Sequence, residues 1–141
     1  MSTLIESKSL TDGLLYQHFH PHIHAFTFTD SIRETIDAGY DKIIELDTYH
    51  AQNGLHIQYL YVLDHITLTS YMALKLQKAT ALTLAELTES IAIVADTFLA
   101  AVIDRLMMPL INQEAQSVTR FFTTEQEAFA WFEQRREEIG Y

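Results

Sequence analysis

The sequence contains no cysteine, which excludes disulfide bonds, a thiolate nucleophile and cysteine-ligated zinc or iron–sulfur sites. Its 141 residues, 48% of them hydrophobic, are nevertheless enough to bury a core without crosslinks. Glycine and proline are also scarce, at 4 and 2 residues, and no flexible linker divides the chain. We therefore expect one folded domain over residues 13–141, preceded by an N-terminal tail at residues 1–12.

Basic residues are few. The 9 Lys and Arg residues stand against 19 Asp and Glu residues, which gives a formal net charge of −10. Such an excess of negative charge repels phosphate backbones and anionic lipids. We therefore expect no nucleic-acid partner.

Long apolar runs are absent as well. A helix that crosses a membrane needs about 20 consecutive apolar residues. The richest stretch, residues 98–111, is interrupted by Asp104, Arg105 and Pro109. The N-terminal segment is polar and lacks the apolar centre of a secretory signal. These features predict a cytoplasmic protein without a membrane span.

The segments that are present alternate between extended and helical patterns. Short β-like runs at residues 14–18 and 22–28 flank Pro21 and predict an antiparallel hairpin. Further strands are predicted at residues 56–63, 91–95 and 117–122, and helices at 30–48, 69–79, 96–109 and from 124 onward. Strands that alternate with helices form a mainly parallel sheet. We expect a single α/β domain with a mixed, mostly parallel sheet of about five strands, flanked by about four helices.

Helix starts are marked by residues that can cap them. Ser31 and Glu34 have the spacing of a capping box, as do Thr124 and Glu127. Asp96 precedes a third predicted helix and is suited to cap it.

Three stretches of the chain resemble the STAS / SpoIIAA-like family. They are the hairpin that leads into the first helix (residues 23–31), the strand-to-helix passage at 61–72, and the ending at 120–132. The ending contains the pattern F-x-x-x-x-E-A-x-x-W, which is typical of the family's last strand and closing helix. The resemblance covers residues 14–135. It implies STAS-like topology and a non-catalytic role as a bacterial protein–protein regulatory module.

The resemblance also implies a place for regulation. Phosphorylatable members antagonise anti-sigma factors through a Ser or Thr at the start of the second helix, where Thr69 or Ser70 would be the nearest equivalent. Those members have small residues and Gly directly after the serine, whereas Tyr71 and Met72 follow Ser70 here. The sequence is closer to the divergent SpoIIAA-like branch, some members of which resemble lipid-carrier domains in shape.

Polar side chains at predicted strand ends form a candidate ligand or partner surface. Ligands of α/β sheets bind beyond the carboxyl ends of the strands. Asp64 follows one predicted strand and Asp96 the next, while Thr67, Thr69 and Ser70 lead from Asp64 into a helix. The simpler interpretation is that these residues satisfy loop amides and cap helices.

Histidines alternate with other residues near the hairpin: His18, His20, His22 and His24. In one continuous strand they would share a face, and neutral imidazoles are common metal ligands. Because Pro21 interrupts the strand, we expect surface or edge histidines around a turn, with no metal and no cofactor. Three further histidines are isolated in the sequence and are expected to be structural: His50, His56 and His65.

The predicted helix within residues 98–110 is apolar around much of its circumference. It is either a core helix or one whose exposed apolar side needs a partner. Its candidate contact residues are Phe98, Val102, Leu106, Met107 and Leu110.

Three functions are compatible with these features. The leading expectation is a module that binds a protein partner or associates with itself as a homodimer. The alternative is a carrier of a small apolar, lipid-like ligand, which predicts an internal pocket of roughly a few hundred Å³. The weakest is an enzyme that uses Asp64 and nearby histidines, because the sequence contains no catalytic motif.

Overall fold

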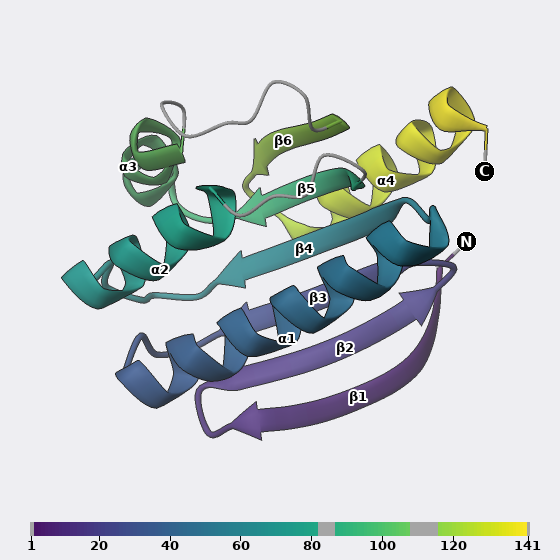
Figure 1. The fold of residues 1–141 in the computed structure, drawn as a ribbon. Coiled ribbons are helices and arrows are strands. Elements are labelled where there is room, and N and C mark those ends of the chain that lie inside the picture. Colours follow the sequence, from purple (N-terminus) through teal and green to yellow (C-terminus); the bar gives the residue numbers. More distant parts are fainter. Residues whose placement is uncertain (1, 82–86, 108–115, 141) are drawn as a thin grey trace.

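A computed structural model describes residues 2–81, 87–107 and 116–140 of the chain. Within these residues six strands form one sheet, and four helices cover its two faces (Figure 1). The strands are β1 (Thr3–Thr11), β2 (Leu14–His20), β3 (Ile23–Phe28), β4 (Ile57–Leu63), β5 (Thr88–Val94) and β6 (Gln116–Phe122). The helices are α1 (Arg33–Asn53), α2 (Ser70–Ala81), α3 (Thr97–Met107) and α4 (Glu125–Ile139).

The strands lie in the sheet in the order in which they occur along the chain. The first three are antiparallel neighbours, and β3 to β6 are parallel. Helices α1, α2 and α3 connect the parallel strands, as crossover connections require. The α/β class and the mixed, mostly parallel sheet predicted from the sequence are confirmed, with six strands in place of about five.

The additional strand is β1, from the segment that we expected to be a tail. It pairs with β2 from Thr3, opposite His20, to Thr11, opposite Leu14. Most of its side chains are exposed, so the sequence has little of the apolar alternation that would predict this strand. A tight turn at Gly13 joins the two strands, and a Cβ atom there would overlap the Asp30 carboxylate. The tail prediction is therefore wrong for Thr3–Thr11, which backbone pairing holds in place.

Alternate residues of each strand face opposite sides of the sheet, and each side has its own core. One side, the three-helix face, packs against α1, α2 and α3 through residues such as Phe26, Tyr59 and Ile93. The other side, the one-helix face, is covered by α4, which lies behind the sheet in Figure 1. Its core consists of Ile23, Ala25, Leu60, Ala92, Ala128, Trp131 and Phe132.

Two of the three predicted helix caps are present. Asp96 accepts a hydrogen bond from the backbone amide of Leu99 (2.8 Å) at the start of α3, and Thr124 accepts one from Glu127 (3.2 Å) at the start of α4. The cap predicted at Ser31 is wrong, because α1 begins one residue later than the capping box requires. The residue before α1 is Ile32, which makes no side-chain cap, and the Ser31 hydroxyl donates instead to the Thr67 carbonyl (2.6 Å).

Candidate ligand-binding site

A cavity of about 260 Å³ lies between the three-helix face of the sheet and helices α1, α2 and α3. Most of its wall is apolar and comes from side chains that include Phe28, Ile43, Leu76, Ile91, Ile93 and Ile103. An apolar cavity of about 150 Å³ holds benzene. By that scale this cavity has room for a molecule of about ten non-hydrogen atoms.

One part of the wall is polar and combines α1 with β4. Asp47 falls one helical turn after Ile43 and therefore points to the same side of α1. The Tyr59 hydroxyl donates to the Asp47 carboxylate (2.6 Å) and also to the Ile43 carbonyl (3.2 Å). The ring of Tyr61 stacks on that of Tyr59, with centroids 5.5 Å apart, and also lines the cavity.

A second carboxyl group reaches the cavity from the sheet. Glu89, on β5, is only 5% exposed and accepts a hydrogen bond from the Ser117 hydroxyl of β6 (3.0 Å). The two residues are direct neighbours in the parallel pairing of these strands. Asp47 and Glu89, called the acidic pair below, thus come from distant parts of the sequence and border the same space.

Burial shifts both acids of the pair toward the protonated form. Desolvation raises the pKa of Asp47 to about 6, although the hydrogen bond from Tyr59 opposes this shift. Desolvation and, to a smaller extent, the charge of Asp47 raise the pKa of Glu89 to about 7. Both pKa values therefore lie near neutral pH, well above the ordinary values of the two carboxyl groups.

Two further charged residues border the cavity, and they are less buried than Glu89. Lys75 on α2 forms an ion pair with Asp37 (3.5 Å) and lies over the ring of Tyr40, 4.3 Å from its centroid. Asp104 on α3 is exposed. Carboxyl groups therefore outnumber amines around the space.

The strand-end residues predicted as a ligand surface lie elsewhere. None of them is among the described residues that line the cavity. The Asp64 carboxylate is exposed, 3.4 Å from the His65 imidazole, and Thr69 accepts a hydrogen bond from the Met72 amide at the start of α2 (3.1 Å). Ser70 and Thr67 are exposed. The acidic pair instead lies toward the amino ends of the parallel strands.

Helix α3 divides its apolar residues between the core and the surface. Leu99 is buried, Ile103 and Met107 line the cavity, and Phe98 is 80% exposed. Two other predicted contact residues, Val102 and Leu106, are partly buried. Leu110 lies outside the described residues.

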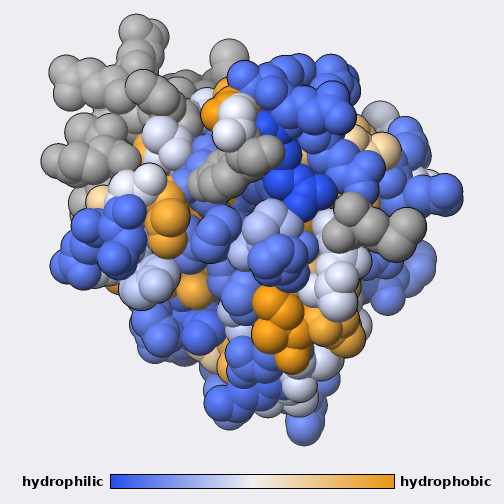
Figure 2. Space-filling model, turned by 90° about the vertical axis from the view of Figure 1, so that its right-hand side faces the viewer, coloured by the Kyte–Doolittle hydropathy of each residue, from blue (hydrophilic) through white to orange (hydrophobic). Residues whose placement is uncertain are grey.

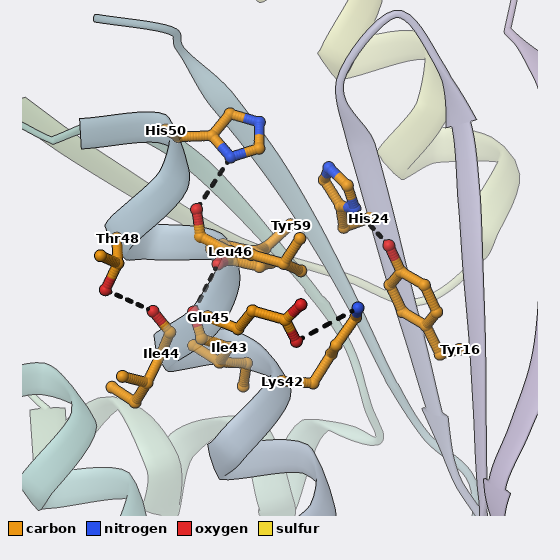
Figure 3. A network of polar contacts seen from close by, with 10 residues as sticks. All are labelled: Tyr16, His24, Lys42, Ile43, Ile44, Glu45, Leu46, Thr48, His50 and Tyr59. Carbon is orange, nitrogen blue, oxygen red and sulfur yellow. Dashed lines mark hydrogen bonds and ion pairs between the residues drawn. The ribbon is translucent and has the colours of Figure 1, made fainter. Parts of the chain in front are cut away.

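Four histidines, His18, His22, His24 and His50, gather at the edge of the three-helix face, whereas His20 and His65 are exposed. His18 and His24 are paired across β2 and β3, and their rings stack with centroids 4.3 Å apart. His50 of α1 meets His24 edge-on at 5.3 Å, so it is not isolated (Figure 3). His24 and His50 are only 3% and 2% exposed, which contradicts the expected surface position for His24.

Hydrogen bonds hold only one side of these buried rings. His24 Nδ1 shares a hydrogen bond with the Tyr16 hydroxyl (2.7 Å), and His50 Nδ1 donates to the Leu46 carbonyl (2.8 Å; Figure 3). The Nε2 atoms of His18, His24 and His50 are buried with no hydrogen-bond partner. Desolvation, followed by the neighbouring histidines, lowers the pKa of His24 to about 3. In the described part of the chain no three or more acidic or histidine side chains are arranged to hold a metal ion.

The sequence pattern does indicate the acidic pair. The rule that ligands bind beyond the carboxyl ends of strands, called the strand-end rule below, does not point to it. Glu89 has the same parity in β5 as Ile91 and Ile93, and Asp47 the same helical phase as Ile36 and Ile43. An acid at an inward position of an amphipathic element indicates a buried carboxyl group. What the sequence does not give is the space between sheet and helices that joins the two residues.

Comparisons with protein-family models, curated proteins and solved structures give no match to this chain. The resemblance to the STAS / SpoIIAA-like family therefore stays a prediction. Among the described residues, no helix combines the length and apolar character needed to cross a bilayer.

Proposed function

We propose that this domain binds a small, mainly apolar molecule in the cavity between its sheet and helices α1, α2 and α3. The observation that carries the proposal is the cavity itself, about 260 Å³ with a largely apolar wall. Protein interiors are normally close-packed, and unfilled space in a core reduces stability. A bound molecule would provide the van der Waals contacts that the side chains around the empty space lack.

The cavity favours one of the functions that the sequence left open. A protein-interaction module requires only a solid core and an exposed surface, whereas a carrier requires internal space of this kind. The proposed activity is therefore reversible binding without a chemical step. This is the alternative that the SpoIIAA-like resemblance also offered, through relatives with the shape of lipid carriers.

The proposal is tested with 1-octanol, whose size is close to the capacity of the cavity. We expect saturable binding with a Kd of about 100 μM, since ligands of this size gain only a fraction of a kcal/mol per atom. Methyl groups of Ile91 and Ile93, which face the cavity, should shift in NMR spectra during the titration. Shifts confined to surface residues would contradict the proposal.

A matched pair of substitutions locates the binding. Ala79 lines the cavity, whereas Ala130 is exposed on α4. Ala79→Leu adds three carbon atoms to the wall and should weaken octanol binding at least tenfold, while Ala130→Leu should leave it unchanged. Equal effects of the two variants would place the ligand outside the cavity.

Self-association is a second candidate, because Phe98 is 80% exposed at the start of α3. Figure 2 shows the side of the molecule that lies to the right in Figure 1, where hydrophilic residues predominate and hydrophobic ones form small, separate groups. Helix α3 lies to the left in Figure 1 and is the better place for an apolar contact. A dimer that sediments as a monomer after Phe98→Ser would support this role, and a wild-type monomer at high concentration would exclude it.

A further inference from the structure

Among the described residues, the acidic pair has no positively charged partner. Asp47 accepts a hydrogen bond from the neutral hydroxyl of Tyr59, and Glu89 accepts one from the neutral hydroxyl of Ser117. Across residues 2–81, 87–107 and 116–140, no Lys or Arg nitrogen lies within 4.0 Å of either carboxylate. A buried carboxylate without a cation is strongly destabilising, so a proton or an external cation would stabilise Glu89, and to a smaller extent the partly buried Asp47.

Two basic side chains from elements around these strands have other partners. Lys75, at the cavity, pairs with Asp37 and lies over the rings of Tyr40 and Tyr71. Arg135 belongs to α4 on the one-helix face, where it bonds to Ser90 and Glu138. Neither side chain neutralises the acidic pair.

Aromatic rings add a second feature that favours a cation. Tyr59 and Tyr61 stack beside the acidic pair, and Phe28 and Tyr40 also line the cavity. The face of an aromatic ring attracts a positive charge, and more strongly where water is excluded. Of the described charged residues that border the space, three are carboxyls (Asp47, Glu89 and Asp104) and one is the amine of Lys75.

We propose that the ligand of this cavity is a hydrophobic amine, with its ammonium group at the acidic pair of Asp47 and Glu89 and its hydrocarbon part against the apolar wall. This inference rests on the proposed function, since it specifies what the cavity accepts. A cation there supplies the counter-charge that the described residues do not provide. An alcohol of the same shape fills the space without supplying it, and a carboxylate adds a further negative charge.

The test uses three probes that share one hydrocarbon chain: octylamine, 1-octanol and octanoate. Each is titrated into the wild-type protein at about pH 8, where both acids of the pair are ionised. We expect octylamine to bind at least tenfold more tightly than 1-octanol, and octanoate to bind more weakly than either. Methyl shifts at Ile91 and Ile93 show that all three occupy the same site.

The pH dependence separates a specific ion pair from general attraction to an acidic protein. Octylamine keeps its charge when the pH is lowered to about 5.5, whereas most of the acidic pair becomes protonated. Its affinity should fall at least tenfold over this range, while that of 1-octanol stays constant. Lys75 and Asp104 are the other charged residues among the described ones that border the cavity.

Substitutions complete the test. Glu89→Gln and Asp47→Asn should each reduce the preference for octylamine over 1-octanol at least fivefold without weakening 1-octanol. Glu125→Gln, the same change at an exposed residue of α4, should have no effect. If 1-octanol or octanoate binds as tightly as octylamine, the inference is wrong but the proposed function stands. If no probe reaches the cavity, both are wrong.

Discussion

The two faces of the sheet are covered in different ways. A single helix, α4, closes the one-helix face, where Trp131 and Phe132 pack on small residues such as Ala25 and Ala92. Three helices share the opposite face, and the cavity lies between them and the strands. The three-helix face also buries Glu89 and His24, and Asp47 is partly buried there.

This difference indicates that the two faces have different roles, one in stability and the other in keeping internal space. On the one-helix face, Ala128, Trp131 and Phe132 of α4 pack closely on the strands, and this packing supplies stability. The three-helix face gives up part of that stability to keep a cavity and ionisable groups inside the protein. The following predictions test whether the contrast is real, beginning with the largest expected effect.

Removing one phenylalanine ring from each face compares their packing directly. Phe132 is completely buried under α4, whereas Phe28 borders the cavity. Phe132→Ala should lower the free energy of unfolding by about 3–5 kcal/mol. Phe28→Ala should cost at least about 1 kcal/mol less, because part of its ring already faces empty space. Urea unfolding of both variants measures the difference, and equal losses would mean that the two faces are packed alike.

The acidic pair should make the protein less stable as the pH rises. The pKa of Glu89 is about 7 in the folded protein against 4.5 as its ordinary value, so the folded state holds the extra proton between these pH values. Stability therefore falls as the pH rises from about 4.5 to 7, by up to about 3 kcal/mol for this residue. Glu89→Gln should flatten the dependence in this window. An unchanged slope in the variant would show that Glu89 ionises freely and is not desolvated.

The buried histidine produces the opposite dependence on the same face. The pKa of His24 is about 3 in the folded protein against 6.5 as its ordinary value, so the unfolded chain binds the proton first. The stabilisation is complete above about pH 6.5 and is lost as the pH falls toward 3, which amounts to about 2 kcal/mol at pH 5.

The variant His24→Gln isolates this effect. Glutamine does not titrate and can still bond to the Tyr16 hydroxyl, so the acid-side loss between about pH 6.5 and 5 should shrink by the stated amount. His65→Gln is the control, because the His65 side chain is 98% exposed. The assignment fails if the two variants lose stability equally between these pH values.

The sequence predicts the fold better than the site, for a physical reason. The period of apolar residues reports which element forms, and it placed β2 to β6 and the four helices close to their observed bounds. It missed β1, whose side chains remain in water, and therefore one of the six strands. The cavity depends on the distance between the sheet and the three helices that pack on it. No local sequence pattern encodes that distance.

The same reason explains why the strand-end rule failed here. It directed attention to Asp64 and Asp96, which are exposed, and Asp96 caps α3. Glu89 and Asp47 carry the same chemistry at inward positions of β5 and α1, but they meet only in the folded chain. Short-range features such as the Thr124 cap were predictable, because each involves residues within one turn of helix.

The smallest expected effect comes from comparing the starts of the helices on the two faces. The Thr124 hydroxyl accepts from the Glu127 amide and fixes the first turn of α4, the only helix over the one-helix face within the described residues. Thr124→Ala should cost about 1 kcal/mol of stability. Ser31 has the same spacing before α1, yet its hydroxyl bonds to the Thr67 carbonyl in an exposed loop.

The variant Ser31→Ala should therefore cost about 0.5 kcal/mol or less, because it removes a solvent-exposed hydrogen bond and no helix cap. Thermal unfolding of both alanine variants beside the wild type provides the comparison. A larger loss at Ser31 than at Thr124 would mean that α1 depends on a cap after all. The helices of the three-helix face would then depend on capping residues as much as α4 does. The cavity alone would have to explain the looser packing of that face.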